Sequence, residues 1–110
     1  MFNMRNESEL IRLYADDVLR ACIYYLEDRK DAENAFQETF ALAHKRQLFG
    51  NENALRINLF KVVREVCGAL YFPDDGEEWL YTSYFGLTLG EAADILGRGI
   101  TRRKLVMHTS

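Results

Sequence analysis

The sequence has little proline, little glycine and no long apolar run. Of its 110 residues, one is proline and seven are glycine. Because these two residue types interrupt helices, their scarcity predicts an all-α fold. The chain also has few of the alternating β-branched runs that would indicate strands. No apolar run approaches the ~20 residues of a membrane-spanning helix, and the start does not resemble a signal peptide. We therefore expect a cytoplasmic protein that does not bind a membrane.

Cysteine is also scarce, and its two positions do not suggest a metal site. Neither a Cys-x-x-Cys nor a His-x-x-x-His spacing occurs, although such spacings are typical of metal ligands. Cys22 and Cys67 each stand among apolar residues, which favours two buried free thiols. A disulfide, or a metal pair with His44 or His108, is the alternative. We expect neither a metal nor another cofactor.

The chain lacks the excess of positive charge that is usual in nucleic-acid-binding proteins. Its formal net charge is −3, so any DNA contact would be local. Such a contact is expected in residues 98–110, because this segment contains no acidic residue. The basic residues in this segment are Arg98, Arg102, Arg103 and Lys104.

Apolar residues at three- and four-residue spacing predict a series of helices. The expected ranges are 7–26, 31–47, 53–70, 77–84 and 89–96, with a last helix from Thr101. The expected N-caps are Asn6, Asp31, Asn53, Thr88 and Thr101. Thr88 and Glu91 have the spacing of a capping box.

Residues 31–40 form the most informative stretch. One face of this helix is apolar and small; it carries Ala32, Ala35, Phe36, Thr39 and Phe40. Glu33, Gln37 and Glu38 then fall on the opposite side. An acidic, amide-bearing side on an amphipathic helix predicts a surface that docks onto a partner.

The segment Pro73-Asp74-Asp75-Gly76 divides the chain. A length of 110 residues suits one domain or two very small ones, and this break predicts domains at residues 1–71 and 72–110. In the second, two short helices joined by Gly97-Arg98-Gly99 outline a helix-turn-helix. Aromatic residues at helical spacing are expected to pack its core against the third helix: Trp79, Tyr81, Tyr84 and Phe85.

Several stretches resemble, in the right order, a bacterial RNA polymerase sigma factor of the extracytoplasmic-function group. Residues 31–40, Asp-Ala-Glu-Asn-Ala-Phe-Gln-Glu-Thr-Phe, are similar to the family's Asp-Ala-Glu-Asp-x-x-Gln-Glu-x-Phe segment. Residues 55–65, Leu-Arg-Ile-Asn-Leu-Phe-Lys-Val-Val-Arg-Glu, are similar to its Arg-x-Trp-Leu-Tyr-Arg-Ile-Ala-Arg-Asn helix. Tyr-Phe-Gly-Leu-Thr at 84–88 and Glu-Ala-Ala-Asp-Ile-Leu-Gly at 91–97 are similar to the family's Tyr-Phe-x-Gly-Leu-Ser-x-x-Glu-Ile-Ala-x-x-Leu-Gly.

This resemblance implies a transcription initiation factor that binds core RNA polymerase and promoter DNA. It implies a three-helix sigma core domain followed, almost without a linker, by the helix-turn-helix domain. The residues implied to dock on the polymerase β′ clamp are Asp31, Glu33, Gln37 and Glu38. Those implied to contact DNA are Arg56, Lys61 and Arg64 in the third helix, and Thr101, Arg102, Arg103 and Lys104 in the last. An antisigma protein is a further possible partner.

Other features favour a sigma-derived module that binds polymerase or an antisigma protein without reading promoter DNA. Asn58 stands where the family usually has Trp, and Glu65 where it usually has Asn. Glu65 would place a negative charge near DNA phosphates. If the third helix ends at Leu70 and the second domain starts at Pro73, the connection spans only ~11 Å, whereas promoter elements lie at least ~34 Å apart. For the basic residues of the third helix, a solvated surface is the alternative.

No pattern of a catalytic site is present. The chain has no nucleophile paired with a base, no phosphate-binding loop and no metal-ligand spacing. The adjacent carboxylates of Asp16 and Asp17 point to different sides of a helix, and the acidic residues at 74–78 are typical of a solvated turn. We therefore expect no enzymatic activity.

Overall fold

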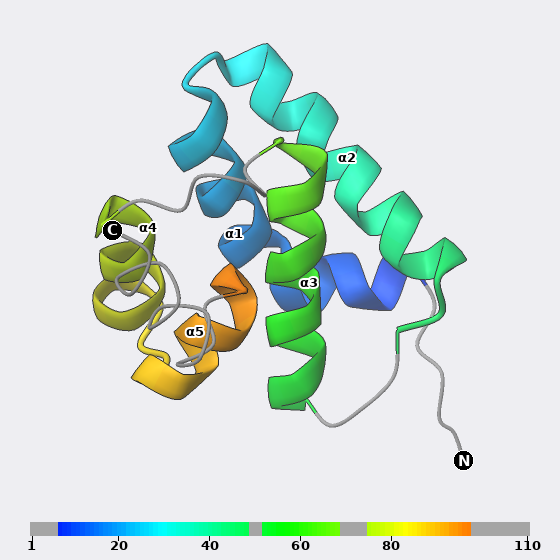
Figure 1. Cartoon of the computed structure of the whole chain (residues 1–110). Coiled ribbons are helices and arrows are strands. Elements are labelled where there is room, and N and C mark those ends of the chain that lie inside the picture. Colours follow the sequence, from blue (N-terminus) through cyan, green and yellow to red (C-terminus); the bar gives the residue numbers. More distant parts are fainter. Residues whose placement is uncertain (1–6, 49–51, 69–74, 98–110) are drawn as a thin grey trace. The chain divides into compact units, whose positions relative to one another are not determined.

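The structure is a computed structural model that describes residues 7–48, 52–68 and 75–97 (Figure 1). Within these ranges every regular element is a helix, so the all-α prediction is confirmed. The chain divides into two compact units, residues 1–71 (unit 1) and residues 72–110 (unit 2).

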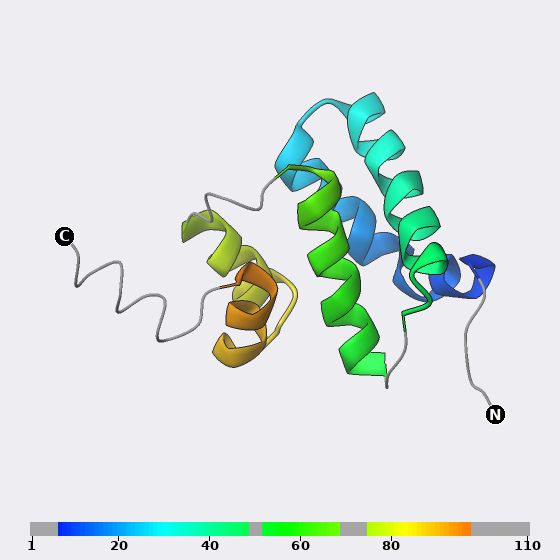
Figure 2. The same ribbon diagram turned by 45° about the vertical axis from the view of Figure 1, so that its right-hand side comes forward.

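The described residues of unit 1 form three helices that all contact one another. They are α1 (Glu7–Leu26), α2 (Arg29–Lys45) and α3 (Glu52–Val66). Figures 1 and 2 both show α2 and α3 side by side, with α1 crossing behind α3. Each helix directs an apolar stripe inward. The largest fully buried side chains of this unit are Val18, Cys22, Thr39, Phe40, Leu59, Phe60 and Val63.

The turn between α1 and α2 is shorter than predicted, and the expected N-cap was wrong. Asp28, not Asp31, caps α2: its Oδ1 accepts hydrogen bonds from the backbone N–H groups of Lys30 (2.8 Å) and Asp31 (3.1 Å). Glu27 has a φ of 49°, which ends α1 and places Asp28 at the first extended position. Asp31 falls in the first turn of α2, where a carboxylate interacts favourably with the helix dipole.

The third helix also differs from its predicted range. It begins at Glu52, so Asn53 lies inside it and is not its cap, and it ends at Val66 instead of Leu70. Gly68 has a φ of 76°, a left-handed conformation that glycine adopts easily and that commonly ends helices. Nine residue steps therefore separate Val66 from Asp75, the first residue of the next helix. They can span about 30 Å when extended, far more than the ~11 Å expected.

The first described element of unit 2 is a helix whose second half has the wider turns of a π-helix. The α-helix α4 (Asp75–Trp79) continues into the π-helix η1 (Leu80–Tyr84). The N–H of Phe85 donates to the carbonyl of Leu80, five residues back, at 2.9 Å. The sequence predicted one continuous α-helix, because its apolar spacing fits either hydrogen-bonding pattern.

The aromatic side chains of unit 2 divide into two groups. Tyr81 and Phe85 are buried, and their ring centroids lie 5.9 Å apart. Trp79 is 58% exposed and Tyr84 49% exposed. The prediction that all four belong to the core is therefore right for two and wrong for two. Their packing against the third helix stays a prediction.

The helix α5 (Leu89–Leu96) matches its predicted range and its predicted cap. The Thr88 hydroxyl accepts from the N–H of Glu91 at 3.0 Å, and the Thr88 N–H donates to the Glu91 carboxylate at 2.9 Å. Gly97 ends the helix in a left-handed conformation, with a φ of 68°. The caps expected at Asn6 and Thr101, and the last helix, lie outside the described residues.

Candidate protein-docking surface

The inner side of α2 is anchored in the core of unit 1. Its buried residues are Ala32, Ala35, Thr39, Phe40 and Ala43. Phe36 is half-buried and packs edge-on against Phe40, with ring centroids 5.2 Å apart. All the residues predicted to form the apolar side therefore lie on the inner side, and the helix is held there by packing.

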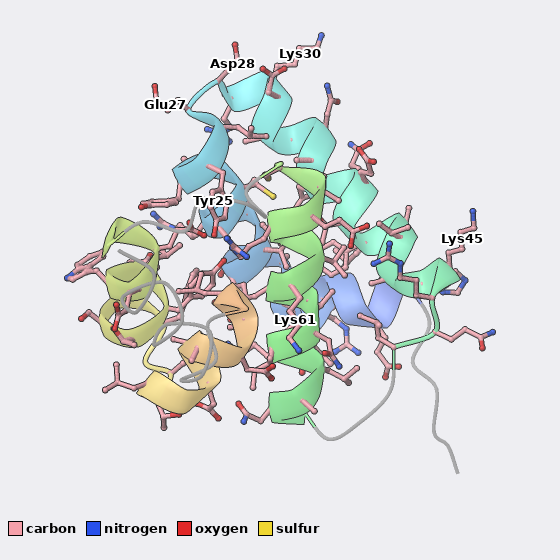
Figure 3. The ribbon with its side chains drawn as sticks, viewed as in Figure 1. Tyr25, Glu27, Asp28, Lys30, Lys45 and Lys61 are labelled. Carbon is pink, nitrogen blue, oxygen red and sulfur yellow. The ribbon has the colours of Figure 1, made fainter. Side chains whose placement is uncertain are left out.

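The opposite side of α2 is exposed over its first half. Asp31, Glu33, Gln37 and Glu38 all have exposed side chains, and we call these four residues the α2 outer face. In Figure 3 this helix runs from Lys30, beside the turn of Glu27 and Asp28, to Lys45 at its far end. Asp31 and Glu38 are seven residues apart, so the face extends over ~10 Å of the helix axis.

The charge of the α2 outer face is partly offset by a neighbour on the same helix. Arg29 Nε lies 3.1 Å from Glu33 Oε2, and both side chains are well exposed. Exposed pairs of this kind contribute little to stability and exchange easily with water or with another partner. The face is therefore acidic and accessible, with one carboxylate already paired to a guanidinium.

A bidentate ion pair joins the C-terminal ends of α2 and α3. Arg46 Nη1 and Nη2 lie 2.9 and 2.6 Å from the two carboxylate oxygens of Glu65. These hydrogen bonds lower the pKa of Glu65 and raise the pKa of Arg46. Glu65 was expected to place its charge near DNA phosphates. In the structure Arg46, the residue that follows α2, balances that charge.

The basic residues predicted on α3 do not share one solvated surface. Arg56 Nε lies 2.8 Å from Asp17 Oδ2 on α1, and its guanidinium lies 5.7 Å from the centre of the Phe60 ring. Arg64 is only 2% exposed. Lys61 is half-buried, and Figure 3 shows its side chain projecting from α3. The solvated-surface alternative is therefore wrong for Arg64, and Arg56 already has a carboxylate partner.

The sequence analysis missed the ion-pair partners of Arg56 and of Glu65. Asp17 is 39 residues from Arg56, and Arg46 is 19 residues from Glu65. No spacing rule for a single helix relates residues so far apart. The remaining predicted DNA contacts, at Thr101, Arg102, Arg103 and Lys104, lie outside the described residues.

The described residues contain no cluster of His, Cys, Asp and Glu side chains suited to a metal ion. In the same ranges, no helix combines the length and hydrophobicity needed to cross a bilayer. Both cysteines are free; Cys22 is buried, as predicted, whereas Cys67 is only partly buried.

No protein-family model matches the chain, and no curated protein or solved structure is significantly similar to it. The roles assigned to the α2 outer face and to the basic residues of α3 therefore stay predictions.

Proposed function

We propose that the chain is a sigma-factor-like protein of transcription initiation, which binds core RNA polymerase through the α2 outer face. One observation carries this proposal. The four residues that match the family's polymerase-docking segment are all exposed on one side of a helix whose other side is buried. The resemblance of the sequence supplies the partner, the β′ clamp, and the exposure of the face makes it accessible.

The α2 outer face has the chemistry of a rigid acidic recognition surface. Its backbone is held by Phe40 and the small buried residues, so binding does not require the helix to order. Carboxylates at Asp31 and Glu38 can accept charge-assisted hydrogen bonds from arginine or lysine, and the Gln37 amide both donates and accepts. The complementary partner surface is therefore basic, and charge complementarity would also raise the association rate.

Charge reversal on this face tests the proposal. We expect Glu38→Arg to reduce capture of the chain by purified core polymerase by roughly tenfold or more, since one like-charge contact exceeds ~1.4 kcal/mol. Gln37→Arg should reduce it less. Asp16→Arg is the matched control, because Asp16 is also exposed but lies on α1. Equal capture of Glu38→Arg and wild type contradicts the docking role.

The second candidate is a sigma-derived interaction module that binds polymerase or an antisigma protein without reading promoter DNA. The existing contacts of the α3 cations favour this second candidate. Arg56 is bound to Asp17, and Arg64 is buried, so a phosphate contact by either side chain requires an existing arrangement to change. The net charge of −3 also opposes association with DNA.

A gel shift over a range of salt concentrations separates the two candidates. A DNA reader loses affinity steeply as salt rises, with a slope set by the number of phosphates it contacts. We expect Asp17→Asn to strengthen binding if the pair with Arg56 limits it, and Asp16→Asn to have no effect. If the chain does not bind DNA even at low salt but is still captured by polymerase, the result favours the interaction module over the promoter-reading factor.

A further inference from the structure

Unit 2 carries two large aromatic side chains on its surface, one turn apart on one helix. Trp79 is the last residue of α4, and Tyr84 is the last residue of η1. Their side chains are 58% and 49% exposed, whereas Tyr81 and Phe85 beside them are buried. Exposed tryptophan and tyrosine are informative, because residues of this size contribute most to binding when a partner covers them.

The π-helix places both rings on the same side. The N–H of Phe85 donates to the carbonyl of Leu80, five residues back, at 2.9 Å. A turn closed in this way returns to nearly the same side after five residues, which is the separation of Trp79 and Tyr84. In an α-helix with 3.6 residues per turn, they would point about 140° apart. Turns of this rare kind are frequent at functional sites. We call Trp79 and Tyr84 the aromatic face.

The aromatic face is supported by the core of unit 2. The Tyr84 ring packs edge-on against Phe85, with centroids 5.1 Å apart, and Phe85 in turn packs against Tyr81. The N–H of Leu87 donates to the carbonyl of Tyr81 at 2.9 Å, which holds the chain against the helix after Phe85. Because the backbone beneath the two rings is fixed by these contacts, binding would order little of it and would cost little entropy.

The charge around the aromatic face is of one sign. Residues 75–97 contain five acidic residues and no lysine, arginine or histidine, so this stretch has a formal charge of −5. One of the five, Glu78, directly precedes Trp79 and is half-buried. The faces of tryptophan and tyrosine rings also attract cations. The complementary surface is therefore basic as well as apolar, and the phosphates of a nucleic acid would be repelled.

We propose that the aromatic face binds a basic amphipathic helix of a partner protein. The apolar side of that helix packs on Trp79 and Tyr84, and its lysine or arginine side chains meet the ring faces and the negative field of unit 2. A partner helix presents apolar side chains one turn apart, which matches the one-turn separation of the two rings. The described residues of unit 2 form no strand, so they offer no edge to which an extended peptide could add. This inference does not depend on polymerase binding by the α2 outer face.

A synthetic peptide tests this proposal with the full chain. The probe is a leucine–lysine peptide of roughly 15 residues, with leucine at three- and four-residue spacing, and its control has glutamate in place of every lysine. Trp79 is the only tryptophan of the chain, so its emission reports on the aromatic face itself. We expect the lysine peptide, and not the glutamate peptide, to shift this emission to shorter wavelength and to protect Trp79 from acrylamide. Absence of a saturable change with the lysine peptide overturns the proposal.

Single variants locate the bound peptide. Tyr84→Ala should weaken binding of the lysine peptide by roughly tenfold, as truncation of an aromatic anchor does at an interface. Ser83→Ala is the matched control, because Ser83 is exposed on the same helix and should bind as wild type does. If Tyr84→Ala does not fold, Trp79→Ser with a fluorescein-labelled peptide should show the same loss. Equal binding by wild type and a folded variant of the aromatic face, or a loss in Glu38→Arg alone, places the peptide elsewhere and overturns the proposal.

The emission of the protein without peptide tests the other occupants. If Trp79 is already protected from acrylamide in dilute protein, another part of the chain covers the aromatic face. If the protection grows with protein concentration, a second copy covers it. Either result overturns the assignment to a partner helix, whereas an accessible Trp79 at every concentration supports it.

Discussion

The α2 outer face and the basic residues of α3 (Arg56, Lys61 and Arg64, here called the basic side of α3) both lie on helices of unit 1. They differ in what surrounds them. Asp31, Glu33, Gln37 and Glu38 are exposed to solvent, and the ion pair of Glu33 with Arg29 is an exposed contact within α2. On α3, by contrast, Arg56 reaches a carboxylate on α1 and Arg64 is buried. A stripe of like charge in a sequence therefore does not show whether the charge is offered to a partner or used within the fold.

Geometry explains this difference. The helix α2 has one buried side and one open side, so residues opposite its apolar stripe reach water. On α3, in contrast, Arg56 reaches a carboxylate on α1 and Arg64 is buried, so these two cations lie on sides that the fold covers. Docking is for this reason the better supported part of the proposed function, and DNA contact by α3 the weaker part.

The largest expected effect tests whether the α2 outer face is held by packing beneath it. Phe40 is fully buried, and Phe40→Ala should lower the free energy of unfolding by about 3–5 kcal/mol, because it removes an aromatic side chain and leaves a cavity. Gln37→Ala, on the exposed side, should change it by less than about 0.5 kcal/mol. Urea denaturation followed by circular dichroism measures both. Similar values for the two variants would show that the two sides of α2 do not differ.

A smaller effect tests whether the α3 cations are engaged. A double-mutant cycle on Arg56 and Asp17, whose side chains are about one-quarter to one-third exposed, should give a coupling of about 0.5–1 kcal/mol. The same cycle on the exposed pair Arg29 and Glu33 should give about 0.3–0.5 kcal/mol. If the Arg56 coupling is zero, the basic side of α3 is as available as the α2 outer face.

The smallest effect concerns the ion pair that joins α2 to α3. Arg46 lowers the pKa of Glu65 in the folded protein. The pair therefore adds stability above the ordinary pKa of a glutamate, and this contribution disappears as the pH falls through the lowered value. Urea midpoints measured against pH should show wild type slightly above Glu65→Gln at neutral pH, with the two converging in acid. Because both side chains are exposed, a large or pH-independent difference would point to another cause.

Local signals in the sequence were sufficient for several elements. The ranges of α1 and α5, the capping box of Thr88 and Glu91, and the inward side of α2 all follow from spacing and side-chain chemistry within a few residues. These predictions agree with the structure because the hydrogen bonds and apolar faces on which they depend are formed within a single helix. Asp28 and Asp31 are both suitable N-cap residues for α2. The positive φ of Glu27, which ends α1, places Asp28 at the cap position.

Tertiary structure decided what the charged side chains of α3 do. The pair Arg56–Asp17 joins α3 to α1, and the pair Arg46–Glu65 joins the residue that follows α2 to α3. Helical periodicity says which side of its own helix a residue occupies, but it carries no information on the partner that the fold brings to that side. The acidic face of α2 was therefore recognisable from the sequence, whereas the ion pair and the burial that engage the α3 cations were not.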